Sequence, residues 1–250
     1  MTSAAAAPPT RAYRRLSVEE RRTQLLGAAL SLFAHRAPDE VSLDEVAAVA
    51  GVSRPLVYRY FPGGRQQLYE AALRSAADEL KLCFAEPPAG PPTERVTRVL
   101  GRYLAFVDEH DAGFSALLRG GSVAETSRTT AIVDEVRRAA AEQILLHLGR
   151  GDTHAPGPRL RMMVRTWIAA VEAASLIWLD EEKQPPADEL RTWLVDQLIA
   201  MLAATATTDP ETAAAVADLL PLETAESPAG RLADRLVPVV TEAAHLLPPD

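Results

Sequence analysis

The chain has 250 residues, of which 48% are hydrophobic and 24% are charged, and its formal net charge is −8. This composition excludes a chain that is disordered throughout, and its abundant Ala and Leu with only 5% aromatics favour helices. No apolar run approaches the roughly 18 residues of a membrane span, and the Ala- and Pro-rich start does not resemble a signal peptide. We therefore expect a cytoplasmic, all-α protein without membrane contact.

The charges are distributed unevenly along the chain. Residues 10–75 hold ten arginines and seven acidic residues, which gives a net charge near +3. The remainder holds 16 basic and 27 acidic residues, which gives a net charge near −11. A small basic segment attached to a larger acidic one favours a DNA-binding head on a separate body.

A first helix is predicted to follow the low-complexity tail of residues 1–10. The run from Ser17 to Glu20 has the pattern of a capping box, in which Ser accepts the N3 amide and Glu reaches back to the N-cap. Apolar residues then recur with the period of a helix until the chain reaches Pro38, where the helix is expected to have ended.

Two shorter helices joined by a glycine turn are predicted next. A second capping box, Ser42 to Glu45, begins one of them. Gly51 supplies the left-handed turn after it. Ser53 is expected to cap the other helix, in which Pro55 occupies the first turn, where its missing N–H costs little.

This third helix carries the residue types that read a DNA duplex. Val57 and Phe61 lie four apart and face inward, so Arg54 and Arg59 lie off that face. Arginine bidentate to guanine is the commonest specific base contact; the alternative is a solvated arginine paired with a nearby acid. The tyrosines could donate to phosphates or pack within the head, and the cap residues could meet phosphates. The candidate DNA-binding residues are Ser42, Ser53, Arg54, Pro55, Tyr58, Arg59, Tyr60 and Arg65.

Other arginines are candidates for phosphate contacts. Arg65 opens a fourth helix, about residues 65–84, and the helix dipole disfavours a cation there unless a phosphate approaches. Arg11, Arg14 and Arg15 could equally be an arm laid on the DNA or a solvated tail.

The remaining sequence predicts a helical body and a C-terminal extension. Apolar residues at helical spacing indicate helices at 93–108, 122–148, 159–182 and 186–204. The Pro-rich residues 205–250 are expected to form a weakly ordered extension with one or two short helices.

The last two helices of the body are apolar on more than one side. Because a helix with two apolar faces must bury both, one face requires a partner, most simply a second copy of the chain. The sequence thus predicts a homodimer built through residues 159–204. The alternative is one larger core within a single chain.

The spacing of Ala47, Ala50-Gly51-Val52-Ser53, Tyr58, Phe61 and Leu68 resembles the TetR family of transcriptional regulators. The resemblance is specific over residues 17–73 and only architectural beyond. It implies an N-terminal three-helix, helix-turn-helix head and a larger C-terminal helical body for ligand binding and dimerisation. We assign residues 11–75 to the DNA-binding domain, with the start of the connecting helix 65–84, and residues 76–204 to the body.

Two positions depart from the pattern of that family. Pro62, Gly63 and Gly64 place three residues rather than the usual two before Arg65, which puts the usual phosphate contact of this arginine in question. Pro55 is less ordinary in a recognition helix and could shift which side chains reach the bases.

The resemblance also implies an apolar cavity between the helices of residues 93–182. His110, Arg119 and Glu172 lie near the apolar stripes and could orient a ligand, or could lie at the surface or in ion pairs. For each apolar candidate, ordinary core packing is the alternative. The candidate lining residues are Tyr103, Phe106, Phe114, Leu117, Leu118, Met163, Trp167 and Val171.

Together these features predict a repressor that binds a pseudo-palindromic double-stranded DNA operator as a dimer. An unknown small-molecule effector, apolar or amphipathic, would release it. The alternative is a helical small-molecule- or partner-binding protein whose degenerate head does not read DNA. The sequence has no nucleophile elbow, phosphate-binding glycine loop or metal-ligand spacing, so we expect neither an enzyme nor a cofactor or metal.

Overall fold

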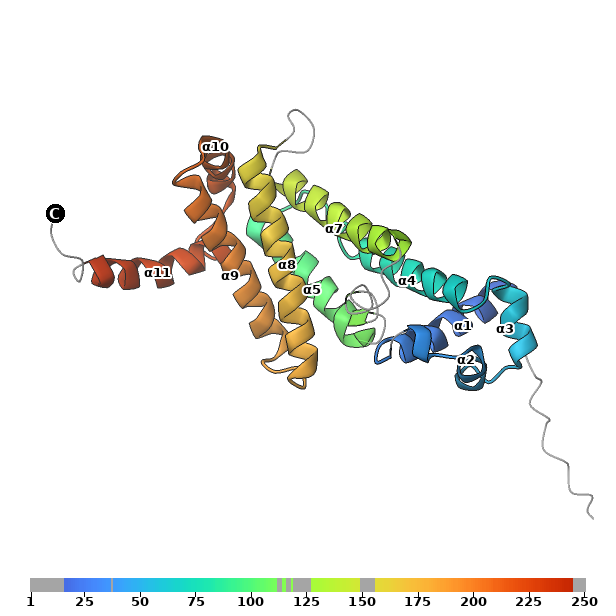
Figure 1. The fold of residues 1–250 in the computed structure, drawn as a ribbon. Coiled ribbons are helices and arrows are strands. Elements are labelled where there is room, and N and C mark those ends of the chain that lie inside the picture. The colour runs from blue at the N-terminus through green and yellow to red at the C-terminus, as the bar shows by residue number, and fades with distance from the viewer. Residues whose placement is uncertain are drawn as a thin grey trace, which may run out of the picture.

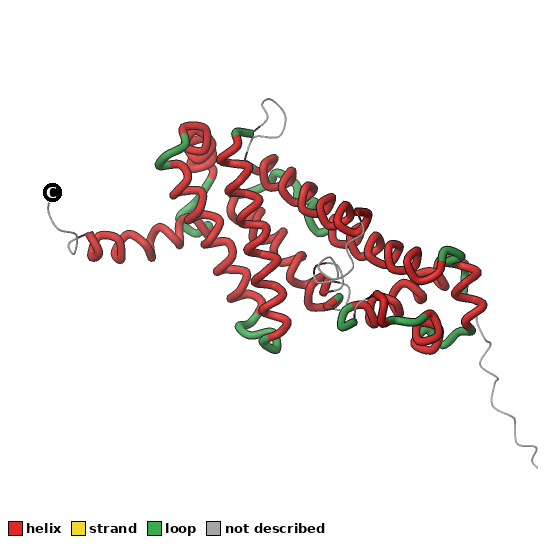
Figure 2. Tube along the Cα trace, viewed as in Figure 1, coloured by secondary structure: helices red, strands yellow, loops and turns green. Residues whose placement is uncertain are grey.

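The computed structural model describes residues 16–36, 38–111, 114–115, 118, 127–148 and 156–244. Every regular element in these ranges is a helix, which confirms the all-α class (Figure 2). The candidates Arg11, Arg14, Arg15, Leu117 and Arg119 lie outside the described residues.

The N-terminal helices form a separate head at one end of the molecule (Figure 1). Its elements are α1 (Val18–Phe33), η1 (Pro38–Glu40), α2 (Leu43–Val49) and α3 (Arg54–Tyr60). α4 (Gly64–Leu82) begins in the head and runs into the body, starting one residue before the predicted Arg65.

The two capping boxes of the head are confirmed. The Ser17 hydroxyl accepts the Glu20 amide at 3.1 Å, and the Glu20 carboxylate accepts the Ser17 amide at 2.7 Å. Ser42 and Glu45 make the same pair of bonds at 3.2 and 2.8 Å. These bonds satisfy N–H groups that would otherwise lack a partner in the first turn, so the sequence pattern fixes where α1 and α2 begin.

The predicted cap at Ser53 is wrong in its chemistry. Ser53 occupies the N-cap position of α3, but its hydroxyl makes no capping hydrogen bond. Pro55 has no N–H to offer, and the Leu56 N–H donates to the Ser53 carbonyl at 2.9 Å instead. The Ser53 hydroxyl therefore makes no hydrogen bond to the first turn of α3.

Gly51 makes the turn between α2 and α3, as predicted. Its φ of +64° lies in the left-handed region. The Gly51 N–H donates to the Ala48 carbonyl at 3.1 Å, and the Val52 N–H donates to the Ala47 carbonyl at 2.9 Å. This pair of bonds is a Schellman motif, which ends α2 and turns the chain toward α3.

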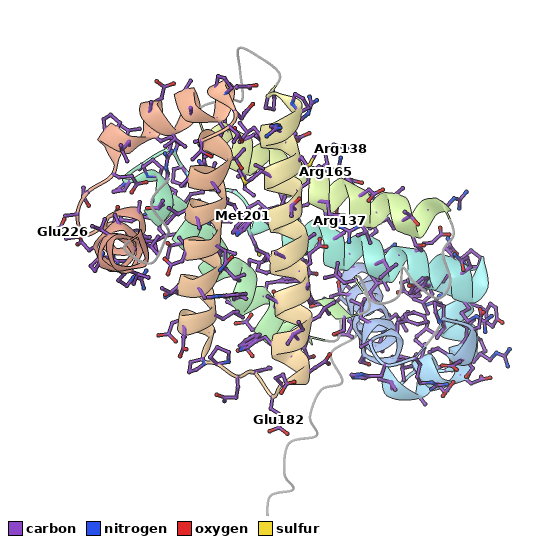
Figure 3. All side chains as sticks on the ribbon, turned by 60° about the vertical axis from the view of Figure 1, so that its left-hand side comes forward. Arg137, Arg138, Arg165, Glu182, Met201 and Glu226 are labelled. Carbon is purple, nitrogen blue, oxygen red and sulfur yellow. The ribbon has the colours of Figure 1, made fainter. Side chains whose placement is uncertain are left out.

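The body is a group of longer helices whose ends agree with the predicted ranges to within a few residues. They are α5 (Pro92–Glu109), α7 (Ser127–His147), α8 (Pro158–Asp180) and α9 (Ala187–Ala206). α8 and α9 run side by side, as Figures 1 and 3 both show. The capping box expected at residues 122–125 lies outside the described residues.

The C-terminal extension contains more helix than we predicted. It forms α10 (Pro210–Leu219), η3 (Leu220–Leu222) and α11 (Pro228–Ala244), of which α11 has 17 residues. Asp209 caps α10 by accepting a hydrogen bond from the Thr212 amide at 3.0 Å. The prolines that suggested weak order include Pro210 and Pro228, and each of these begins a helix. Both helices contact α9.

α4 is fastened to the body by ion pairs as well as by packing. Arg74 and Lys81 of α4 both bond the Glu135 carboxylate of α7, at 2.5 and 2.7 Å. At its other end α4 packs on α1, where Tyr69 meets Phe33 edge-on with ring centroids 4.8 Å apart. One continuous helix therefore joins the N-terminal head to α7.

One helix of the body passes a length and hydropathy test for a membrane span. α8 has a mean hydropathy of 1.4 over its most apolar 18 residues. Core helices of soluble proteins pass the same test, and α8 packs on α5, α7, α9 and α10. Packing within the body buries 39% of that apolar window.

Candidate DNA-binding surface and ligand cavity

α3 has one buried face and one exposed face. Val57 and Phe61 are 0% and 1% exposed, and they anchor α3 in the core of the head, as predicted. Arg54, Tyr58 and Arg59 lie on the exposed face. The buried residues fix which side chains α3 presents outward, so its exposed face is the candidate surface for a DNA groove.

Arg54 is held by neighbours in the head. Its guanidinium bonds the Asp44 carboxylate of α2 at 3.0 Å and lies over the Tyr58 ring, 5.5 Å from the centroid. The Tyr58 hydroxyl and the Asp44 charge raise the pKa of Arg54. A base contact by Arg54 would have to replace the bond to Asp44, whereas Tyr58 remains exposed beside it.

Arg59 is the least constrained arginine of α3. It is exposed, its guanidinium lies 5.7 Å from the centroid of the half-buried Tyr60 ring, and no ion pair to it is found among the described residues. Stacking on an aromatic ring directs a guanidinium without using its N–H donors. All five donors of Arg59 are therefore open to a phosphate or a base edge.

Arg65 makes a contact within the head rather than standing free. It donates to the Asp39 backbone carbonyl at 2.9 Å and meets the Asp39 carboxylate at 3.4 Å. The extra residue before it is accommodated by Gly64, whose φ is +70°, and by Gly63, whose N–H donates to Gln67 at 2.8 Å. Arg65 thus ties α4 to η1.

Ser42 and Ser53 differ in what they can offer a phosphate. The Ser42 hydroxyl both accepts the Glu45 amide and donates to its carboxylate at 2.7 Å, so it is already bonded. Ser53 and Pro55 are exposed at the start of α3, where the Ser53 hydroxyl makes no capping hydrogen bond.

An apolar cavity of about 70 Å³ lies between α4, α5, α7 and α8. An apolar cavity between helices is a candidate site for a small molecule. Of the predicted lining residues, Phe106 and Met163 are buried but do not line it, so these two predictions are wrong. Those that do line it are Tyr103, Phe114, Leu118, Trp167 and Val171.

Few polar groups face this cavity. The buried Tyr103 hydroxyl has no hydrogen-bond partner within the described ranges, and burial raises the pKa of Tyr103. Ser175, its neighbour, donates its own hydroxyl to the Val171 carbonyl at 2.8 Å. Glu172 lines the cavity and forms an ion pair with Arg137, with a shortest N···O distance of 2.9 Å. Of the two alternatives given for Glu172, a ligand-orienting group or a member of an ion pair, the structure thus has the ion pair.

The sequence analysis missed the contribution of α7 to the cavity. Arg137, Gln143 and His147 line it, together with apolar residues one helical turn apart. A stripe with that spacing was readable in the sequence, but Arg, Gln and His at its edge look like solvent-facing positions. His110, by contrast, stacks on Phe106 at 4.7 Å and does not line the cavity.

Both parts of the chain match models of known families. The model of bacterial regulatory proteins of the tetR family matches residues 25–72, and that of the tetracyclin repressor-like C-terminal domain matches residues 92–201. A crystal structure of a tetR-family transcriptional regulator from Streptomyces coelicolor is 50% identical, with a TM-score of 0.79. The match covers 90% of this chain and 100% of that one.

Two curated proteins are also similar to this chain. The HTH-type transcriptional activator FasR of Mycolicibacterium smegmatis is 28% identical over 172 residues, which cover 68% of this chain and 77% of that protein. The HTH-type transcriptional regulator BetI of Rhizobium meliloti is 32% identical over 118 residues, 45% of this chain and 58% of that protein.

Proposed function

This chain belongs to the TetR family of DNA-binding transcriptional regulators, and on that premise we propose that it is an effector-released repressor that binds its operator as a homodimer. The observation that carries the proposal is the exposed face of α3, where Arg59 stands beside Tyr58 with its donors free. We assign residues 11–75 to the DNA-binding domain and residues 76–204 to the body.

In the DNA complex, each head would place α3 in a major groove. Two heads about 34–36 Å apart would meet grooves one turn apart on a pseudo-palindromic operator. Arg59 would read a base edge or a phosphate, and Tyr58 and the start of α3 at Ser53 would contact phosphates. Arg54 would add a contact only where the DNA replaces Asp44.

The second copy would pack on the exposed apolar surface of α8 and α9, which we name the α8–α9 face. No other helix among the described residues covers it, and Figure 3 shows the two helices side by side. This supports the partner over a single larger core. Ile199 instead lines a cavity beneath α10 and α11, so it is not counted here. The face consists of Met162, Ala169, Ala170, Ala173, Ile177 and Trp193.

The effector would enter the body beside α7 and shift α4, because α4 both lines the cavity at Leu80 and bonds Glu135 of α7. The lining of this cavity favours an apolar or amphipathic molecule. A coupling of about 1–3 kcal/mol between effector and DNA would suffice for regulation.

The direct test of DNA recognition is selection of bound fragments from a random pool of duplexes. We expect a two-fold symmetric sequence with half-sites about one turn apart, bound with an affinity that falls steeply with salt. Failure to enrich any sequence would favour the alternative, a binding protein whose head no longer reads DNA.

Activation is the second candidate for the sign of regulation, because the similar FasR is named an activator. A reporter gene placed behind the selected operator distinguishes the two. Repression lowers reporter output when the protein is co-expressed, and activation raises it.

A further inference from the structure

A second and larger apolar cavity lies on the C-terminal side of the body. Its volume is about 300 Å³, against about 70 Å³ for the first cavity. It is bordered by the start of α5, the end of α7, α9, α10, η3 and α11, and it opens to solvent on one side, where Leu220 and Leu236 are 65% and 42% exposed. Its wall is made chiefly of side chains such as Leu198, Ile199, Leu219, Leu232 and Leu236.

The two cavities meet. Val96 of α5 and Ile144 and His147 of α7 line both of them. Two apolar spaces that share a wall of three side chains are separated by no more than the thickness of those side chains. A molecule too long for the first cavity would extend into the second by displacing these side chains.

His147 is the polar group at this meeting point. The residue is 7% exposed, and its buried Nε2 atom has no hydrogen-bond partner among the described residues. A buried polar atom without a partner is destabilising, so a bound molecule that supplies the partner recovers that cost. Burial and the nearby positive charge of Arg95 lower the pKa of His147; Arg98 acts in the same direction and Glu86 opposes it.

The helices that border the second cavity are fastened to the body. Glu223 accepts both the Thr93 amide, at 2.8 Å, and the Thr93 hydroxyl, at 2.7 Å. Arg235 of α11 pairs with Asp196 of α9 at 2.7 Å. These polar bonds tie the segment after η3 to α5 and tie α11 to α9 beside the apolar space.

We propose that the effector site continues past His147 into the second cavity, and that its ligand is an elongated single-chain amphiphile with an oxygen or nitrogen that bonds His147. The proposal deepens the effector-released function above and rests on it. α10 and α11 then belong to the ligand-binding site rather than to an appendage.

Chain length is the variable that tests this proposal. Palmitate and octanoate, each used below its critical micelle concentration, serve as long and short probes in calorimetric titrations of the full chain. Because each buried methylene favours binding, we expect palmitate to bind at least about tenfold more tightly than octanoate.

A filling variant locates the long end of the chain. Ala233→Phe on α11 adds a ring at a position that lines the open side of the second cavity, and Ala217→Phe on α10 is the control, since both alanines are exposed but Ala217 lines neither cavity. We expect Ala233→Phe to weaken palmitate by about tenfold and octanoate by less than about twofold. Equal effects on both probes, or no effect on palmitate, would overturn the proposal.

His147→Leu tests the polar contact. The substitution should weaken the binding of palmitate more than the binding of hexadecane, a hydrocarbon of similar length that has no hydrogen-bond acceptor. The far-ultraviolet circular dichroism should not change. Loss of affinity for both probes alike would overturn the role of His147. If palmitate binds as expected but does not change the affinity for the operator, the extended ligand site stands and the effector-released function fails. If neither palmitate nor octanoate binds, the extended site fails, and the selection of operator sequences still tests DNA recognition.

Discussion

Three arginines of the head that look alike in the sequence have different surroundings in the fold. Arg54 is paired with Asp44, Arg65 with Asp39, and Arg59, in the part of the chain that the structure describes, contacts only the Tyr60 ring. An arginine that must leave an acid before it meets DNA gains less from the contact than one whose donors are free. The residue with the largest net contribution to DNA binding should therefore be Arg59.

We expect Arg59→Ala to weaken specific operator binding by about 1–3 kcal/mol. The fold should be unaffected, because Arg59 is exposed and the packing of α3 depends on Val57 and Phe61. The measurement is a fluorescence-anisotropy titration with the selected operator. Arg138→Ala removes the same charge from an exposed position of α7 and should leave the affinity almost unchanged. Equal losses in both variants would refute the assignment.

The capping box of α2 should make the folding stability of the head depend on pH in the acidic range. The Arg36 guanidinium, followed by the Ser42 amide and hydroxyl, lowers the pKa of Glu45 from 4.5 to about 2. Because the folded pKa lies below the unfolded one, this stabilisation is fully present above about pH 4.5 and is lost as the pH falls toward 2.

Thermal unfolding followed across that pH window checks the point. In Glu45→Gln the melting temperature should fall less between about pH 4.5 and about pH 2 than in the parent chain, since the variant has no carboxylate to protonate. Ser42→Ala, which removes one of the bonds, should show intermediate behaviour. Identical slopes in all three proteins would contradict this account.

At the scale of elements, the starts and ends of α1 and α2 follow from local chemistry that the sequence displays. The Ser–Glu boxes and Gly51 were readable because each acts within four residues. The partners of Arg54 and Arg65 lie in other elements, so no local pattern could indicate them. α11 was underestimated because counting prolines ignored that Pro228 can begin a helix.

Two glycines of the head should respond in opposite ways to alanine. Gly51 has a φ of +64°, so Gly51→Ala should lower the free energy of unfolding by about 1–2 kcal/mol through backbone strain. Gly27 lies inside α1 with open space around an added methyl group. Gly27→Ala should therefore raise the free energy of unfolding by about 0.5–1 kcal/mol.

Urea unfolding of the two variants and the parent chain measures these differences. If both substitutions raised the free energy of unfolding, the turn at Gly51 would tolerate a side chain. If both lowered it, α1 would gain nothing from an added methyl group. The pair serves as its own control, because both substitutions add the same methyl group.

At the scale of the whole molecule, the quaternary structure and the ligand site depend on surfaces that single helices cannot reveal. The surplus apolar face of α8 was visible in the sequence, and its Ile177 is 60% exposed in the fold. Which residues line a cavity was less readable, since a lining residue and a core residue share the same apolar stripe. Trp167 lines the cavity while Met163, one turn earlier on the same helix, does not.

The α8–α9 face can be tested by charge. Ile177→Asp and Trp193→Asp, at positions 60% and 52% exposed, should each convert the dimer to monomer, because an unpaired carboxylate would be buried at the seam. Sedimentation velocity at micromolar concentration gives the mass. Leu82→Asp, at an exposed position of α4 outside the face, should remain dimeric. A monomeric parent chain, or dimers in every variant, would refute the interface.

The continuity of α4 from the cavity to the head has a geometric consequence. A helix of 19 residues is about 28 Å long, so it acts as a lever whose short displacement at one end becomes a longer one at the other. If a ligand tilts α4 by about 5°, the far end moves by about 2.5 Å. Hydrogen bonds to base edges tolerate only a few tenths of an ångström, so that angle alone would take α3 out of register with its groove.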